Sequence, residues 1–286
     1  MSGNKIAERT IDLEKVIRDK SPNGAKYIPG FVFGYLQRVI HEKEINDFLF
    51  KNRSFVGIDF LDKLVDEFET KIDIQGEENL PVNGRHIIAA NHPLGGLDGI
   101  VLMHVVGKKR KDFVFPVNDL LLFLPNLKPL FIPINKHGSN VENLHIINDT
   151  FESEKLILYF PAGLVSRKQN GKIEDLEWKK TFISKAKKYK RDVIPTFIAG
   201  SNTNFFYNLA NIRKTLGLKA NIEMLYLPNE MFKQRGKSIR FIFGEPIPYK
   251  TFDKRHNFKE WALRIKKYVY AMGNGHTEPF DPDIDY

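Results

Sequence analysis

Cysteine is absent from this chain of 286 residues. Its absence excludes disulfide bonds, thiolate zinc sites and covalent catalysis by a thiol, and it is compatible with a reducing compartment. Apolar runs long enough to cross a bilayer are absent as well. The two most hydrophobic stretches, YIPGFVFGYL and LLLFLPNLKPLFIPI, are interrupted by Pro, Gly, Asn and Lys, so we expect no transmembrane helix. The charged, amphipathic N-terminus does not resemble a secretory signal peptide.

Motifs of several enzyme classes are missing too. The chain has no P-loop, no dinucleotide-type GxGxxG, no HExxH and no carboxylate triplet at the spacing of metal ligands. The sequence therefore predicts no metal site and no bound nucleotide cofactor.

The chain carries a net positive charge. Lys and Arg number 44 against 35 Asp and Glu, which gives a net charge of +9. Such a charge attracts polyanions, which include nucleic acid, anionic lipid surfaces and CoA-like substrates. Nucleic-acid binding rests on this charge alone, because no nucleic-acid-binding motif is recognisable.

The hydrophobic pattern changes along the chain. Up to about residue 75, apolar residues recur at helical spacing. From about residue 84, short apolar runs alternate with helical patterns, which is typical of an α/β domain with a largely parallel, mixed sheet flanked by helices. We expect an N-terminal helical unit over 1–75, a candidate for membrane association, and an α/β domain over 76–286. The expected strands are 86–90, 112–117, 129–134, 155–160, 193–199, 222–227 and 239–244, and the expected helices include 99–109, 139–151, 177–190 and 258–272.

The sequence NHPLGGLDG lies between an expected strand and an expected helix. Ligands bind at this edge of an open α/β sheet, beyond the carboxyl ends of the strands. Pro93 and the pair Gly95 and Gly96 interrupt a helix, so the loop can bring His92 to Asp98. A histidine held by a carboxylate keeps one tautomer and presents a free nitrogen as a base, which suits deprotonation of a hydroxyl that attacks an acyl group. Alternatively, Asp98 only caps the following helix and His92 is a structural loop residue.

A second candidate site is LYFPAGLVSRKQNGK, which leaves an expected strand and turns at Pro161 and Gly163. Backbone N–H groups of a Gly-containing turn, together with Ser166, Arg167 and nearby lysines, would make a cradle for an anion. An ordinary turn with solvated charges is the alternative. A third candidate, LFIPINKHG, ends a strand near Lys136, where either a lipid head group binds or a plain loop lies.

These three features, in this order, resemble the glycerolipid acyltransferase family of the 1-acylglycerol-3-phosphate acyltransferase type. Its members carry an Asn-His-(four residues)-Asp motif after a strand, a strand that ends in a basic residue, a Phe-Pro-Glu-Gly turn and a Val-Ile-Pro strand. The corresponding positions here are Asn91, His92 and Asp98, then 134–136, FPAG at 160–163 and VIPTF at 193–197.

The resemblance implies an O-acyltransferase. His92 would be the general base on the acceptor hydroxyl and Asp98 would orient it, with no covalent enzyme intermediate. The donor would be a thioester of acyl-carrier protein or CoA, with no further cofactor. Lys136 and Arg167 are the candidates for binding an anionic group of the acceptor. The full set of expected substrate-binding residues is Asn91, Gly95, Gly96, Lys136, Pro161, Gly163, Ser166 and Arg167.

Two positions depart from the family pattern. Five residues rather than four separate His92 from Asp98, and Ala162 stands where the family has Glu. The chain therefore looks like a divergent, hemolysin-like branch that includes O-acyltransferases of ornithine- and glycine-lipid synthesis. The implied acceptor is a lyso-amino-acid lipid or a lysophospholipid. The alternatives are a 1-acylglycerol-3-phosphate acyltransferase of phosphatidic acid synthesis and, in another class, a non-catalytic, hemolysin-like membrane-binding protein.

The basic charge fits a membrane-associated enzyme. The runs GKKRK at 107–111 and KKYKR at 187–191 are candidates for contact with an anionic bilayer or an acidic acyl-carrier protein. The apolar segments 28–39 and 45–50 are candidates for insertion into the bilayer interface. We expect a peripheral, monotopic enzyme on the cytoplasmic face of a membrane, with no nucleic-acid partner.

Overall fold

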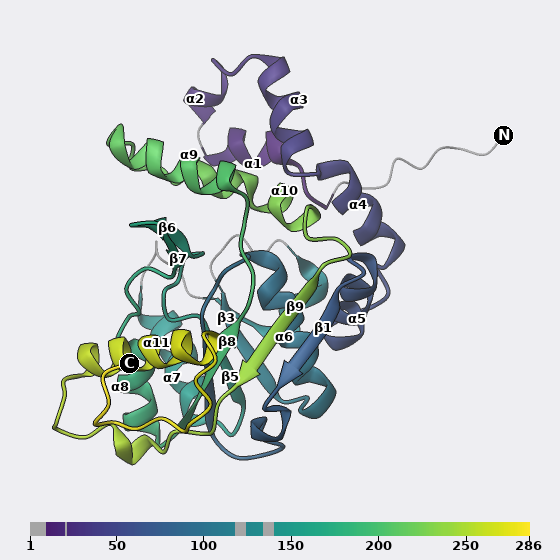
Figure 1. Ribbon diagram of the computed structural model, residues 1–286. Coiled ribbons are helices and arrows are strands. Elements are labelled where there is room, and N and C mark those ends of the chain that lie inside the picture. Colours follow the sequence, from purple (N-terminus) through teal and green to yellow (C-terminus); the bar gives the residue numbers. More distant parts are fainter. Residues whose placement is uncertain (1–9, 21, 118–123, 134–139) are drawn as a thin grey trace.

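The computed structural model describes residues 10–20, 22–117, 124–133 and 140–286. The described chain opens with helices and continues as an α/β sandwich (Figure 1). The last of the opening helices packs on the sandwich, and the predicted division at residue 75 stays a prediction. The opening helices are α1 (Leu13–Lys20), α2 (Pro22–Ala25), α3 (Gly30–Val39), α4 (Glu42–Lys51) and α5 (Ile58–Glu67).

A seven-stranded sheet, in the order β1-β9-β8-β2-β5-β3-β4, forms the centre of the described molecule. Neighbouring strands are parallel except β8 and β9. The strands from β8 to β4 therefore end at one edge, called here the carboxyl edge. The predicted α/β class with a largely parallel, mixed sheet is confirmed. The strands are β1 (Lys71–Gln75), β2 (His86–Ala90), β3 (Phe113–Val117), β4 (Phe131–Pro133), β5 (Leu156–Tyr159), β8 (Asp192–Ile198) and β9 (Ser238–Phe243).

Helices cover both faces of the sheet (Figure 1). α5 and α6 (Gly96–Lys109) cover one face, and α7 (Asn140–Glu152), α8 (Thr181–Tyr189) and α11 (Phe258–Gly273) cover the other. Residues of β2 alternate between the two cores, because successive side chains of a strand point to opposite faces: Ile88 packs toward α6 and Ile87 toward α8. This double burial explains the continuous apolar run of β2.

Shorter elements cover the carboxyl edge. They are the hairpin of β6 (Arg167–Gln169) and β7 (Lys172–Glu174), then α9 (Asn204–Thr215), the 3-10 helix η4 (Ile222–Tyr226) and α10 (Leu227–Phe232). Figure 1 shows α9 and α10 near α2 and α3 at this end of the molecule, with the C-terminus at the other end. No described helix is both long enough and apolar enough to cross a membrane.

One strand prediction and one helix prediction differ from the structure. Residues 222–227, predicted as a strand, form η4 and the start of α10. Pro228 stands in the first turn of α10, where its fixed backbone angle favours a helix, and Glu223 is fully buried in ion pairs with Arg167 and Arg213. Conversely, Lys71–Gln75 lies within the stretch predicted as helical but forms β1, an edge strand beside β9.

The helix prediction over 258–272 is confirmed as α11. Trp261, Ile265 and Val269 on its inner face are buried, whereas Phe258 is exposed at the first turn. The helix predicted over 177–190 begins only at Thr181. Trp178 nevertheless reaches the core, because the turn before α8 points its indole toward Asp175.

Candidate active site

The candidate site begins where β2 ends at the carboxyl edge. The side chain of Asn91 donates a hydrogen bond to the carbonyl oxygen of Ile198 at 2.9 Å and accepts one from the N–H group of Ile198 at 2.6 Å. Because Ile198 ends β8, these bonds tie two neighbouring strand ends together. Asn91 is among the residues predicted to bind substrate. Both the oxygen and the nitrogen of its buried side-chain amide form hydrogen bonds to β8.

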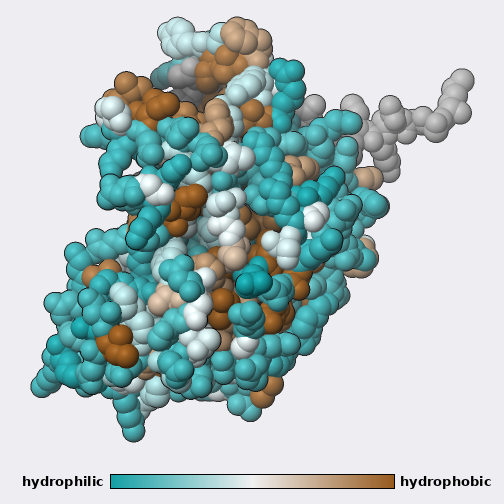
Figure 2. Space-filling view, in the orientation of Figure 1, coloured by the Kyte–Doolittle hydropathy of each residue, from teal (hydrophilic) through white to brown (hydrophobic). Residues whose placement is uncertain are grey.

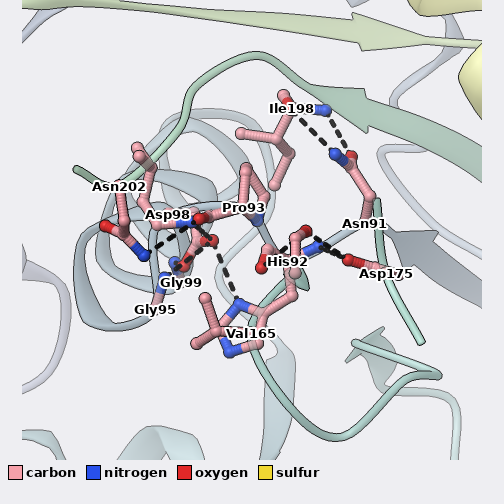
Figure 3. Close-up of polar contacts among 12 residues, drawn as sticks. Asn91, His92, Pro93, Gly95, Asp98, Gly99, Val165, Asp175, Ile198 and Asn202 are labelled. Carbon is pink, nitrogen blue, oxygen red and sulfur yellow. Dashed lines mark hydrogen bonds and ion pairs between the residues drawn. The ribbon is translucent and has the colours of Figure 1, made fainter. Parts of the chain in front are cut away.

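The turn from β2 into α6 brings His92 and Asp98 together (Figure 3). Nδ1 of His92 lies 3.0 Å from Oδ2 of Asp98. The same oxygen accepts the backbone N–H groups of Leu94 at 2.8 Å and Gly95 at 3.2 Å, groups that a helix start leaves without partners. The two alternatives for Asp98, an acceptor at the helix start and a partner of the histidine, are therefore both present in one buried side chain.

Two predicted glycines allow this turn to pack tightly. Gly95 has φ +86, in the region that glycine adopts without strain. A Cβ atom on Gly95 would lie 3.0 Å from Leu227 and 3.3 Å from Val165. A Cβ atom on Gly96 would lie 3.3 Å from the sulfur of Met231. Both glycines therefore allow the close approach of the His92 loop to α10 and to Val165.

The ring of His92 is held in the orientation of a base. Asp98 at Nδ1 selects the tautomer that is protonated there, so Nε2 carries the free electron pair. The ring stacks on Phe160 with 4.1 Å between centroids and keeps 17% of its side chain exposed. Burial disfavours the imidazolium, but the carboxylates of Asp98 and Asp175 outweigh it and raise the pKa of His92 above its usual 6.5.

A second buried carboxylate, Asp175, accepts a hydrogen bond from the backbone of His92. Its Oδ1 accepts the backbone N–H of His92 at 3.1 Å and the hydroxyl of Ser166 at 2.6 Å. Its Oδ2 accepts the indole N–H of Trp178 at 2.8 Å. Burial raises the pKa of Asp175, and these hydrogen bonds oppose the rise. Sequence reasoning missed Asp175, because it lies 83 residues from His92 in the acidic run IEDLE, where nothing marks it.

The FPAG turn follows β5 and lies beside His92. Gly163 has φ +65, and its N–H group donates to the carbonyl of Phe160 at 3.0 Å, which closes the turn. The backbone of Lys179 donates to the carbonyl of Pro161 at 3.1 Å, and a Cβ atom on Gly163 would lie 3.3 Å from Nζ of Lys179. The side chain of Lys179 is exposed and forms no ion pair within the described chain. The turn thus has a cation beside it that sequence reasoning did not single out.

Arg167 is buried at the start of β6. Its guanidinium donates to Glu223 at 2.9 Å and to the carbonyl of Val165 at 2.7 Å, and it lies 5.3 Å from the ring centre of Phe206. Glu223 also pairs with Arg213 at 2.9 Å. Two arginines and one glutamate leave one formal positive charge in this cluster. Glu223 thus occupies part of the guanidinium predicted to bind an anion, and that role of Arg167 stays a prediction.

The remaining predictions for the site have mixed outcomes. Ser166 is joined to His92 through the hydrogen bond from its N–H group to the His92 carbonyl at 2.8 Å. Lys136 lies outside the described residues, and its role stays a prediction. The stretch after Arg167 is the β6–β7 hairpin, whose turn has φ +49 at Asn170 and φ +79 at Gly171. An Asn-Gly pair is a strong hairpin signal, so the sequence contained the evidence for it.

These features agree with the family that the sequence resembles, and comparison with known proteins confirms it. A family model described as "Acyltransferase" matches residues 15–277. The chain therefore belongs to this acyltransferase family and is an enzyme that transfers acyl groups.

Two relatives are similar over almost the whole chain. The lyso-glycine lipid O-acyltransferase of Bacteroides thetaiotaomicron is 47% identical over 264 residues, which cover 92% of this chain and 97% of that protein. A protein of the same name from Phocaeicola vulgatus is 47% identical over 264 residues, which cover 92% and 95%. Among solved structures, the 1-acyl-sn-glycerophosphate (LPA) acyltransferase PlsC from Thermotoga maritima matches with a TM-score of 0.47 and 17% identity, over 87% of this chain and 95% of that chain.

Proposed function

We propose that this enzyme moves a fatty acyl group from a thioester donor to the hydroxyl group of a lyso-glycine lipid. The names of the two relatives at 47% identity support this acceptor. The observation that carries the chemistry is the 3.0 Å contact between His92 and Asp98 at the carboxyl edge of the sheet. A lyso-amino-acid lipid is one of the acceptors predicted from sequence, and lysophosphatidic acid is the alternative to be tested beside it.

His92 is the general base of the proposed reaction. Its Nε2 takes the proton of the acceptor hydroxyl while the hydroxyl oxygen attacks the carbonyl carbon of the thioester. Asp98 stabilises the imidazolium that forms. The tetrahedral intermediate then expels the thiolate, and the thiolate takes the proton from Nε2. The products are an ester and a free thiol, with no covalent enzyme intermediate and no cofactor besides the donor.

Among the residues that the structure describes, we propose two partners for the acceptor's anionic group. A glycine head group linked through its nitrogen presents a carboxylate, which favours a cation that is not already neutralised. Lys179 beside the FPAG turn is such a cation in the described chain. Arg167 contributes through the single net positive charge that it shares with Arg213 and Glu223. We propose that Lys179 makes the direct contact and that this cluster adds a longer-range attraction.

The proposed donor is an acyl-carrier-protein or CoA thioester. Both carriers are polyanions, so the net charge of +9 favours their approach. We propose that the enzyme works as a peripheral, monotopic protein on the cytoplasmic face of a membrane, where these thioesters and a lyso-lipid acceptor meet.

An acyl-transfer assay tests this function directly. Purified enzyme is given acyl-CoA or acyl-carrier-protein donors with lyso-glycine lipid, a lyso-ornithine lipid or lysophosphatidic acid, and the ester product is followed by mass spectrometry. We expect ester formation on lyso-glycine lipid and its loss in His92→Ala. A product formed only with lysophosphatidic acid would replace the proposed acceptor. No ester with any acceptor would contradict the proposed function.

A further inference from the structure

Exposed apolar side chains gather over the carboxyl edge of the sheet. The two segments 22–39 and 204–226, called here the upper face, make up 41 of the 286 residues. Seventeen large apolar side chains are exposed in the described part of the chain, and nine of them lie on the upper face. Figure 2 shows apolar patches at the end of the molecule where Figure 1 has α2, α3 and α9. The nine are Tyr27, Phe31, Tyr35, Phe205, Ile212, Leu216, Leu218, Ile222 and Leu225.

The two segments of the upper face form one surface. The hydroxyl of Tyr35 in α3 lies 2.9 Å from the hydroxyl of Tyr226 in η4. The ring of Phe205, at the start of α9, packs edge-on against Tyr226 with 5.0 Å between centroids. Phe31 is 77% exposed and Leu216 is 67% exposed, so side chains at both ends of this surface have little protein around them.

The charge of the upper face has a single sign toward solvent. Its basic residues are Lys26, Arg38, Arg213, Lys214 and Lys219. Its one acidic residue, Glu223, is fully buried between Arg167 and Arg213. Exposed aromatic and aliphatic side chains, together with basic and no exposed acidic residues, are the composition of a surface that enters an anionic lipid interface.

The upper face also covers the site. Phe206 in α9 packs under the guanidinium of Arg167, and Leu227, which follows η4, would touch a Cβ atom on Gly95 at 3.0 Å. The basic runs that the sequence offered for a bilayer lie elsewhere. They stand at the C-terminal ends of α6 and α8, and α6 runs about 21 Å away from the site. Their arginines, Arg110 and Arg191, are buried and donate to backbone carbonyls.

We propose that the upper face is the membrane-docking surface and that it seats on an anionic bilayer over the active site. This inference rests on the proposed function, because a lyso-lipid acceptor resides in the bilayer that the surface would enter. Docking in this orientation turns the carboxyl edge, where the His92 side chain keeps 17% of its surface exposed, toward the lipid, so that the acceptor hydroxyl reaches Nε2 without leaving the interface. The amino-terminal edge of the sheet, with both basic runs, then faces away from the membrane.

Vesicle sedimentation tests the docking surface without any catalytic step. The vesicles are phosphatidylcholine, either alone or with about one third phosphatidylglycerol. One variant, Lys214→Glu with Lys219→Glu, reverses charge on the upper face. The matched control, Lys111→Glu with Lys188→Glu, makes the same change of net charge at exposed lysines of the opposite edge. A third variant, Ile212→Ser with Leu216→Ser, removes apolar contacts.

We expect the upper-face charge variant to bind anionic vesicles at least about thirtyfold more weakly, the equivalent of about 1 kcal/mol for each basic residue. The matched control should change by less than about threefold, and the Ser variant should weaken binding to both kinds of vesicle. Circular dichroism and thermal unfolding verify that each variant is folded. Equal weakening by the matched control would overturn the proposal. So would unchanged vesicle binding with a loss of acyl-carrier-protein binding, which would make the upper face a protein-docking surface.

An activity arm separates this inference from the proposed function. The upper-face variants should lose acylation of acceptor embedded in vesicles and keep acylation of a dispersed, short-chain acceptor, because they leave His92 untouched. Equal loss on both acceptors would contradict the docking proposal. If wild-type enzyme acylates no lyso-lipid but binds vesicles as expected, then the proposed function fails and the docking surface stands.

Discussion

Nδ1 of His92 lies 3.0 Å from Oδ2 of Asp98, and that same oxygen accepts the N–H group of Leu94 at 2.8 Å. The orientation of the His92 imidazole and the start of α6 therefore depend on a single carboxylate. A displacement of the Asp98 carboxylate would therefore disturb both the helix start and the hydrogen bond that fixes the imidazole. Variants of Asp98 should separate these two functions.

Asp98→Asn and Asp98→Ala should differ in stability more than in activity. Both remove the carboxylate charge, and we expect both to lower kcat/KM by about 10²–10⁴-fold. Only Ala leaves the N–H groups of Leu94 and Gly95 without an acceptor in the buried turn, which costs roughly 2–6 kcal/mol for two orphaned donors. Urea unfolding and steady-state kinetics measure the two effects. Equal stability of the two variants would contradict the role of Asp98 at the helix start.

His92→Ala should abolish acyl transfer while the protein stays folded. Loss of general-base catalysis lowers kcat/KM by about 10²–10⁴-fold. His104→Ala is a matched control, because Nδ1 of His104 lies 2.9 Å from Asp62 and its side chain is 15% exposed, similar to His92. His104 stands inside α6, away from the strand end, so its variant should keep activity. Acyl transfer that persists in His92→Ala would show that another group is the base.

The pH dependence of kcat/KM should report the raised pKa of His92. The base is active only when unprotonated, so kcat/KM should rise with pH through an apparent pKa above 6.5 and level off beyond it. Asp98 is the larger of the two carboxylate influences, so Asp98→Asn should move this limb to lower pH. Rate profiles from about pH 5 to about pH 9 measure the limb. A limb that stays in place in Asp98→Asn would assign it to a group other than His92.

The fold class could be predicted because the central strands are buried on both faces. The bounds of β2 agree with its apolar run, 86–90, since no polar face interrupts the pattern. Elements at the rim were harder to predict. β1 is an edge strand that pairs only with β9 within the described sheet. Its sequence, KIDIQ, is short and alternates between polar and apolar residues, and it follows the helical pattern of α5. The run IEMLYL at 222–227 is apolar except for Glu223, which made it resemble a buried strand, but residues 222–226 form η4, where Glu223 reaches two arginines.

The pair at the centre of the site could be predicted because its geometry is local. His92 and Asp98 are six positions apart, and the proline and glycines between them predict the bend that brings the two side chains together. Asp175 and Lys179 reach the same place through the packing of β7 and α8 against the carboxyl edge, which no short motif encodes. Burial, rather than residue type, distinguishes Asp175 from its acidic neighbours.

Asp175→Asn should lower kcat through the position and pKa of His92. An amide cannot accept hydrogen bonds at both of its ends, so one of the donors from His92, Ser166 and Trp178 loses its partner. We expect kcat to fall roughly ten- to a hundredfold with little change in KM. The acid limb of the pH profile should also move to lower pH, because the Asp175 carboxylate helps to raise the pKa of His92.

A matched variant at the opposite edge separates this positioning role from stability. Asp192→Asn changes a carboxylate that also accepts a backbone N–H, from Tyr249 at 2.8 Å, at the start of β8. It should leave the pH limb of kcat/KM unchanged even if its unfolding free energy falls. If Asp175→Asn lowers stability but leaves both kcat and the pH limb as in wild type, then Asp175 is structural only.

Gly95→Ala should damage the site more than Gly171→Ala, although both residues have positive φ, at +86 and +79. A methyl group in such a conformation costs about 1–2 kcal/mol at either position. At Gly171 the new Cβ atom meets nothing within 4 Å, whereas at Gly95 it meets Leu227 at 3.0 Å, which adds about 1–3 kcal/mol. Because Gly95 donates to Asp98, the displaced loop should also lower kcat/KM by about tenfold or more, while Gly171→Ala keeps wild-type activity. Urea unfolding and steady-state kinetics compare the two variants. If both variants lose the same unfolding free energy and the same kcat/KM, then the close contact between Gly95 and Leu227 does not position the His92 loop.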